Sequence, residues 1–330
     1  MAQNYYIFRN GRIRRKAHTV YFITPDGQKT PLPVENIEAL WLFGVVRLHT
    51  PLLAFLARKG IPIHVFNYYG FYAGSFLPRR RHPSGLVLIR QVQAYLDVER
   101  RRAIAAEIVD GAVFHMARLL RDYVHRGKPL QAIVRALEDI RADLHRWQTI
   151  DELRSAEGRA RHRYYQALSH VTEAAEYPFV RTRRPPTSPM NALLSFGNAL
   201  LYPAILQEIY RTPLDPTVSY LHEPGERRFS LVLDFADIFR PLVVEPTVLR
   251  LVNTRQMAAE DFEAIGDGVF LSEAGRKKVL KAFDATLQRT VQHRRLKRHV
   301  SYRQLFRLEA YKLVRHLVGD EPYTAFRAWW

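Results

Sequence analysis

The spacing of apolar residues changes once along this 330-residue chain, and that change limits the folds open to it. Up to about residue 85, short runs of β-branched and aromatic residues alternate with turn-forming residues, as in β-strands. From Leu86 onward, apolar residues recur three and four positions apart over long stretches, which is the period of an α-helix. We therefore predict an α+β protein, with a small β domain in residues 1–85 and a larger helical domain in residues 86–330.

The secondary structure follows from the same pattern. Strands are predicted at 5–8, 20–23, 39–43 and 61–66, with hairpin turns at Asn10–Gly11 and Pro25–Gly27. One helix is expected in this domain, from Thr50 to Lys59, since Pro51 suits a first helical turn and Gly60 suits a helix end. Beyond residue 85, helices are predicted at 91–126, 130–146, 150–170, 190–210 and 229–240, and near 271–297 and 301–318.

Positive charge is the strongest compositional signal. Fifty Lys and Arg residues against 32 Asp and Glu residues give a formal net charge of +18, and basic residues cluster at 12–16, 79–82, 181–184 and 293–299. The planar guanidinium group of arginine matches phosphate oxygens, so DNA or RNA is the first partner to expect. A membrane surface fits less well, because the clusters flank no amphipathic anchor.

Other classes of protein are excluded or made less favourable by what the sequence lacks. It contains no cysteine, which rules out disulfides, thiolate metal ligands and a cysteine nucleophile. We see no signal peptide and no stretch of about 18 uncharged apolar residues, and we expect a cytoplasmic protein with no membrane partner.

Two aspartates interrupt an apolar run late in the chain. Asp234 and Asp237 stand three positions apart in the predicted helix, so both carboxylates lie on one helix face. His222 precedes them in a stretch rich in proline that reads as a loop. Close carboxylates repel one another unless a cation compensates. Either these groups face a common ion, or His222 caps its loop and Asp237 pairs with Arg240.

Glu157 is a third candidate acid. Gly158 follows it inside a strong helix pattern, where glycine costs about 1 kcal/mol, so close packing or close approach of a ligand is expected. Arg161 and Tyr164 share the helix face of Glu157, and a simple helix ion pair is an equal alternative. Two carboxylates and one imidazole suit Mg²⁺ or Mn²⁺, which could polarise a phosphodiester.

Three segments resemble the signatures of the CRISPR-associated spacer integrase, the universal protein of CRISPR adaptation. They are Glu157–Tyr165, Asn191–Tyr202 and Leu221–Pro241. In the first domain, residues 5–8, 42–44 and 60–76 fit as well, so the resemblance covers nearly the whole chain. The stretch Phe66–Gly70 is similar to the variant found with type I-B systems.

This resemblance implies both an architecture and an activity. The first domain is expected to be β-sandwich-like and to serve dimerisation and partner binding, and the second to be an all-α catalytic domain. The implied reaction joins the 3′-hydroxyl ends of spacer DNA to the CRISPR repeat, with DNA cleavage as a related activity. The implied partners are double-stranded DNA, a second copy of the chain, and a small ferredoxin-like adaptation protein that bridges two dimers.

The resemblance also assigns residues. Glu157, His222 and Asp237 are implied as ligands of Mg²⁺ or Mn²⁺, and Asp234 as a supporting catalytic residue. Many relatives carry Glu where this chain has Asp237, which keeps the type of ligand. Expected DNA-binding residues surround these groups: Arg161, Arg163, Tyr165, Arg181, Arg183, Arg184, Arg227 and Arg228. Of the two adjacent tyrosines, we expect Tyr165 to face the site and Tyr164 to pack.

Two other functions stay open at this point. The chain could be a non-catalytic DNA-binding scaffold in which the acids form structural ion pairs. It could also be a stand-alone structure-specific nuclease, with water instead of a DNA end as the nucleophile.

Overall fold

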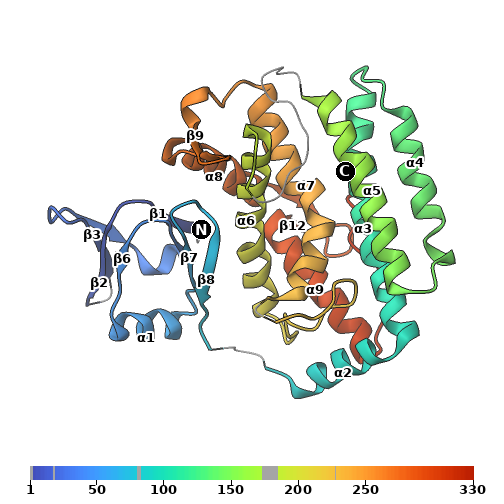
Figure 1. Ribbon diagram of the computed structural model, residues 1–330. Helices are drawn as coiled ribbons and strands as arrows, with labels where there is room; N and C mark the ends of the chain where they lie inside the picture. Colours follow the sequence, from blue (N-terminus) through green and yellow to red (C-terminus); the bar gives the residue numbers. More distant parts are fainter. Residues whose placement is uncertain (1–2, 18, 80–82, 173–184, 227) are drawn as a thin grey trace. The chain divides into compact units, whose positions relative to one another are not determined.

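The computed structural model describes residues 3–17, 19–79, 83–172, 185–226 and 228–330 (Figure 1). The chain divides into two compact units, residues 1–81 and 82–330. The first unit is rich in strands, and the second is larger and mainly helical. The fold is therefore α+β, as the apolar pattern predicts.

Two four-stranded sheets share the core of the first unit. One has the order β1–β5–β7–β8, in which β1, β5 and β7 are parallel and β8 is antiparallel to β7. The other has the order β4–β3–β2–β6. Ile13 and Val20 from one sheet and Leu40 and Ile63 from the other belong to one buried cluster. The strands are β1 (Gln3–Ile7), β2 (Gly11–Lys16), β3 (Thr19–Ile23), β4 (Lys29–Leu32), β5 (Ile37–Leu42), β6 (Val46–Arg47), β7 (Ile63–Phe66) and β8 (Tyr72–Phe76).

The four predicted strands are present as β1, β3, β5 and β7, but the apolar pattern does not reveal β2. All but two of its residues are basic, and Ile13 is its one buried side chain. The hairpin predicted at Asn10–Gly11 is wrong, because β1 and β2 belong to different sheets. Helix α1 (Thr50–Lys59) is confirmed, and Gly60 ends it in the left-handed region with φ +73°.

The second unit is built from long helices (Figure 1). They are α2 (Gly85–Leu96), α3 (Val98–Val124), α4 (Gln131–Ala142), α5 (Ile150–Val171), α6 (Pro189–Tyr210), α7 (Ser230–Asn253), α8 (Glu273–Gln288) and α9 (Tyr302–Val318). Two short hairpins accompany them: β9 (Phe262–Ile265) with β10 (Gly268–Leu271), and β11 (Thr290–Gln292) with β12 (His299–Ser301). The expectation of an all-α second domain is therefore wrong in this detail.

Local chemistry explains where the helices differ from the prediction. The predicted helix 91–126 is broken at Asp97, whose side chain accepts the N–H of Arg100 and caps α3. Helix α7 continues past Arg240 and through Pro241 and Pro246. A proline inside a helix removes one backbone hydrogen bond, so it normally suggests an end. Here both prolines lie in a helix whose side chains are mostly buried, and packing overrides that local cost.

Helix α6 departs from the sequence-based expectation in another way. Among the described residues it is the one helix long and apolar enough to cross a membrane by length and composition, so the prediction that no such stretch exists is wrong. Buried residues make up 78% of its most apolar 18-residue window. A helix that packs against neighbours on all sides is apolar all round, as α6 is.

The segment after α9 packs against α3. Arg118 donates to the carbonyl of Ala328 at 2.6 Å, and the N–H of Ala328 donates to Nε2 of His115 at 3.1 Å. A Cβ placed on Gly111 would lie 2.8 Å from the Cβ of Ala325, so the two backbones approach closely. His115 is thereby sealed in the core as a neutral hydrogen-bond acceptor.

This buried histidine predicts a loss of stability in acid. Burial, followed by the charge of Arg118, lowers the pKa of His115 from 6.5 to about 3. The unfolded chain takes up a proton below its ordinary pKa, while the folded protein resists it. The contribution of His115 to the free energy of unfolding is therefore complete above its ordinary pKa of 6.5. As the pH falls from there towards the pKa of about 3 in the folded protein, this contribution declines by at most about 1.4 kcal/mol per pH unit.

Urea unfolding of the wild type and of His115→Gln over this pH range measures that contribution. Glutamine keeps a hydrogen-bond acceptor but does not titrate. The free energy of unfolding should fall less steeply with acid in the variant, and equal slopes would contradict the prediction.

Candidate metal centre

His222 lies in the loop that leads into α7, and this loop is fixed by its own backbone and by α3. The hydroxyl of Ser219 donates to the carbonyl of His222 at 2.5 Å, and Nε of Arg101 donates to the carbonyl of Tyr220 at 3.1 Å. Ser230, the first residue of α7, donates to the carbonyl of Thr217 at 2.6 Å. The prolines that prevent a helix here thus leave backbone groups that specific side chains satisfy.

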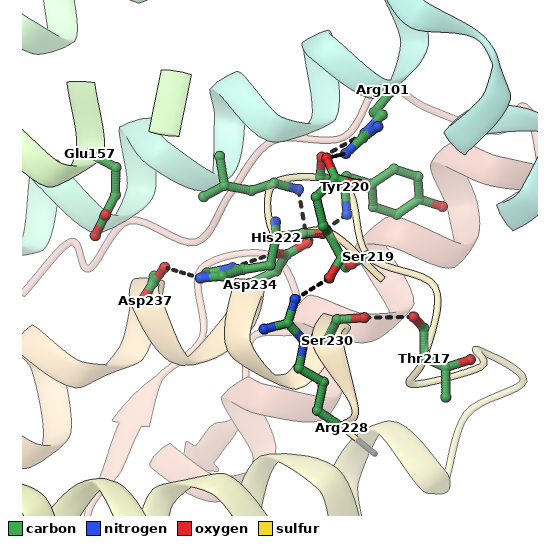
Figure 2. Close-up of polar contacts among 12 residues, drawn as sticks. Arg101, Glu157, Thr217, Ser219, Tyr220, His222, Arg228, Ser230, Asp234 and Asp237 are labelled. Atoms are coloured by element: carbon green, nitrogen blue, oxygen red, sulfur yellow. Dashed lines mark hydrogen bonds and ion pairs between the residues drawn. The ribbon is translucent and has the colours of Figure 1, made fainter. Parts of the chain in front are cut away.

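Asp234 of α7 binds the backbone of this loop (Figure 2). Its carboxylate is fully buried and accepts the backbone N–H groups of Tyr220, Leu221 and His222, at 2.7, 3.2 and 2.9 Å. The same carboxylate lies 2.9 Å from Nδ1 of His222. Four donors therefore converge on this one carboxylate.

This contact fixes the orientation of the imidazole. An ionised carboxylate can only accept, so Nδ1 of His222 carries the hydrogen and Nε2 is left as the acceptor in the neutral ring. Nε2 lies 3.7 Å from Oδ2 of Asp237, which stands one helical turn after Asp234 on α7 (Figure 2). Metal-binding histidines are commonly oriented by a carboxylate in this way.

Asp237 is buried and surrounded by positive charge. Nη2 of Arg161 lies 2.9 Å from its Oδ1, and Nη1 of Arg240 lies 2.6 Å from the same atom. The second contact is the structural ion pair that the sequence leaves open as an alternative. The two arginines therefore leave Oδ2, the oxygen nearest to His222, as the less engaged side of the carboxylate.

Glu157 reaches the centre through Arg161. Nε of Arg161 donates to Oε1 of Glu157 at 2.5 Å, so one guanidinium group joins the carboxylates of α5 and α7. The helix ion pair considered from the sequence is present. It does not stand alone, because the same arginine also binds Asp237.

The charges in this centre shift two pKa values in opposite directions. Burial raises the pKa of Asp237, but Arg161, Arg240 and His222 outweigh it, and the net pKa is lowered. Burial lowers the pKa of His222, but the bond to Asp234 and the charge of Asp237 outweigh it, and the net pKa is raised. Each partner thus favours the charged form of the other.

The donor chemistry fits a hard divalent cation, although Glu157 stands apart. Among the described residues, no three His, Asp or Glu side chains gather as a ready metal site. Asp234 is occupied by its four donors, and Arg161 takes up oxygens of Glu157 and Asp237. A buried guanidinium nitrogen, Nη1 of Arg161, has no acceptor where it lies. Two carboxylates and an oriented imidazole are donor types that suit a cation of the Mg²⁺ or Mn²⁺ kind, and the guanidinium of Arg161 now lies on the oxygens of the two carboxylates.

The predicted DNA-binding residues divide into three groups. Arg163 is exposed and Tyr165 half-buried on α5, whereas Arg161 is 12% exposed and bonded to two carboxylates, which disfavours a DNA contact. Arg228 donates to the carbonyl of Glu223 within the loop at 2.5 Å. Arg181, Arg183, Arg184 and Arg227 lie outside the described residues.

Two smaller expectations have clear outcomes. Tyr164 is fully buried, as predicted for a packing residue. Gly158 is not required for packing, since a Cβ there would meet no atom within 4 Å.

The sequence pattern was not used to single out Glu245, a buried acid in the apolar part of α7. Its signal was the same as that of Asp234 and Asp237, an acid inside an apolar run.

Comparisons with known proteins agree on one family. The family model described as "CRISPR associated protein Cas1" matches residues 5–285. The curated "CRISPR-associated endonuclease Cas1 3" of Thermodesulfovibrio yellowstonii is 45% identical over 328 residues, which cover 99% of this chain and all of that relative.

Solved structures show the same likeness. A Cas1 protein from Thermotoga maritima is similar with a TM-score of 0.88 and 37% identity, covering 98% of this chain and 100% of that one. A casposase bound to integration product shares the fold, with a TM-score of 0.87, 19% identity and coverage of 97% and 92%. A chain of a Cas6-RT-Cas1–Cas2 complex does so with a TM-score of 0.83 and 20% identity, covering 99% of this chain and 36% of that one.

Proposed function

This chain belongs to the Cas1 family, and from that premise we propose that it is a metal-dependent DNA integrase and endonuclease of CRISPR adaptation. It joins 3′-hydroxyl ends of spacer DNA to the CRISPR repeat by exchanging one phosphodiester for another. The same attack on phosphorus with water as the nucleophile cleaves DNA.

One observation carries this proposal: Asp234 orients His222 so that Nε2 faces Oδ2 of Asp237 across 3.7 Å. A histidine that served only to cap its loop would not need its second nitrogen aimed at a buried carboxylate. Glu157, His222 and Asp237 are the proposed ligands, and Asp234 is a positioning residue. This support comes from geometry and donor type together.

The chemistry of the site follows from its charges. A Mg²⁺ or Mn²⁺ ion bound there supplies positive charge to the phosphodiester and so favours attack at phosphorus. The chain itself supplies the oriented imidazole of His222 and a loop held by Asp234. Arg161 and Arg240 keep Asp237 ionised, because their guanidinium groups lie 2.9 and 2.6 Å from the carboxylate. None of these groups recognises a base, which suits an enzyme that accepts many spacer sequences.

The DNA partner is supported by the charge of the protein. The net charge of +18 favours a polyanion, and the basic segment 293–299 spans the turn of the β11–β12 hairpin and the first residue of β12. Lys297 and Arg298 are exposed at this turn. Such side chains bind phosphate without reading sequence, and this binding weakens with salt.

The proposed assembly follows the relatives. One relative of similar fold is part of a complex with Cas2, and another was solved on an integration product, so we assign a small adaptation protein and double-stranded DNA as partners. Dimerisation through the first unit and a type I-B context belong to the same proposal.

An integration assay tests the function. The protein is incubated with a spacer duplex and a supercoiled plasmid bearing the repeat, with and without the small partner protein. We expect joined products with Mg²⁺ or Mn²⁺ and none with EDTA.

The two competing functions give different results in this assay. A non-catalytic scaffold binds DNA but produces neither joined nor cleaved DNA with any metal. A stand-alone nuclease nicks the plasmid in the presence of metal but joins no spacer ends even with the partner. Either result would overturn the proposed integrase activity.

A further inference from the structure

Arg161 binds both Glu157 on α5 and Asp237 on α7, and only part of its guanidinium group is satisfied. Nε donates to Glu157 and Nη2 donates to Asp237. The third nitrogen, Nη1, is buried and has no acceptor. An unpaired donor inside a protein is costly, so an arginine placed this way has a reason to move towards another acceptor.

A carboxylate that could serve stands farther along the same pair of helices. Glu245 follows Asp237 by two helical turns on α7 and is fully buried. The helices are tied together on either side of it, by Arg161 to Asp237 at 2.9 Å and by Nδ2 of Asn253 to the carbonyl of Val171 at 3.2 Å. Along α7, Glu245 therefore lies between two residues that bond to α5, Asp237 and Asn253.

Electrostatics connect Glu245 with the same groups. Burial lowers the pKa of Arg161, but nearby carboxylates outweigh it, Asp237 and Glu157 most strongly and Glu245 less so, and the net pKa is raised. Burial and then the charge of Glu245 raise the pKa of Tyr164, one turn after Arg161 on α5. The carboxyl group of Glu245 thus interacts electrostatically with this face of α5.

The backbone that carries Glu245 is held in place. A Cβ on Gly197 of α6 would lie 2.6 Å from Cγ1 of Val244, so α6 and α7 meet there without a side chain between them. Glu245 can therefore act as a fixed charge, while the long side chain of Arg161 supplies the movement.

Glu157 and Asp237 would hold a divalent cation through oxygens that Arg161 now occupies. Once displaced, the guanidinium would be a buried charge without a counter-ion, which costs several kcal/mol. We propose that Glu245 is the positioning residue that would receive Arg161 if a cation bound at Glu157 and Asp237 displaced it. Arg161 is thus a resident counter-ion that keeps the two carboxylates together until the metal arrives. This inference rests on the proposed metal site.

Titration of the metal-free protein with Mn²⁺, followed by electron paramagnetic resonance and calorimetry, tests this role without any measurement of activity. Glu245→Gln keeps the shape and removes the charge, and should weaken Mn²⁺ binding about tenfold, as loss of an outer-shell partner commonly does. Arg161→Gln removes the competing cation and should leave Mn²⁺ binding equal to or tighter than in the wild type. The double variant should bind Mn²⁺ with an affinity within about twofold of that of Arg161→Gln, because the effect of Glu245 acts through Arg161.

The possible outcomes separate the two proposals. The role of Glu245 is overturned if Glu245→Gln binds Mn²⁺ like the wild type. It is also overturned if this substitution weakens Mn²⁺ binding equally in the wild type and in Arg161→Gln. His222→Ala serves as the control for the site itself. If that variant binds Mn²⁺ like the wild type, the metal site is wrong. If it loses Mn²⁺ while Glu245→Gln does not, only the present inference fails. Should Glu245→Gln not fold, Glu245→Asp keeps the charge but withdraws it, and about threefold weaker binding is expected.

Discussion

Replacing His222 with alanine is expected to reduce strand transfer roughly a thousandfold, because metal-assisted charge stabilisation is worth several kcal/mol and each 1.4 kcal/mol is about tenfold in rate. The imidazole is half-buried and bonded to Asp234, and many other basic side chains carry the positive charge of the protein, so the dissociation constant for DNA should stay within about twofold. Product formation on the repeat plasmid and a separate binding titration measure the two effects.

His170→Ala is the matched control for this prediction. His170 lies exposed near the end of α5, and its loss should leave both rate and binding unchanged. If His222→Ala kept more than about a tenth of the wild-type rate, the ligand assignment would be untenable.

Asp234→Asn is expected to damage both the loop and the site. Each oxygen of Asp234 accepts at least two donors, Oδ2 from the N–H groups of Tyr220 and Leu221 and Oδ1 from two groups of His222. An amide nitrogen in either position would point a donor at donors. Loss of this buried charge should lower the free energy of unfolding by about 3 kcal/mol. Mn²⁺ affinity should also fall roughly 10- to 100-fold, because the imidazole loses its orientation.

Hydrogen exchange distinguishes this result from the loss of a ligand. The amides of Tyr220, Leu221 and His222 should exchange much faster in Asp234→Asn than in the wild type. Asp237→Asn, the matched control one turn away, should bind metal poorly while those three amides stay protected. Equal protection in both variants would show that Asp234 does not hold the loop.

The sequence predicts the two-part architecture well, because the change of apolar period marks it directly. It predicts less well where one element breaks the rule of its class. Strand β2 is almost entirely basic, and only Ile13 reaches the core. Helix α7 runs through Pro241 and Pro246, since burial of its side chains outweighs two lost hydrogen bonds. Both exceptions depend on tertiary contacts that no local pattern records.

The candidate site, too, is predictable where a local pattern marks a residue and unpredictable where a tertiary contact decides. An acid in an apolar run identifies Asp234 and Asp237, and the structure brings both of them next to His222. The sequence does not reveal that Arg161 joins Glu157 to Asp237, because that contact crosses from α5 to α7. In the sequence, arginines close to an acid, such as Arg161 and Arg163 after Glu157, are typical of a DNA-binding surface. In space, Arg161 is an internal counter-ion.

The hydrogen bonds of Asp234 also bear on when such an enzyme can become active. The carboxylate that closes the loop around Tyr220 is the one that aims His222, so the loop and the site form together. A newly made or heat-damaged chain with this loop open lacks an aimed ligand. For a protein proposed to cut and join DNA, that dependence ties the chemistry to the folded state of this loop.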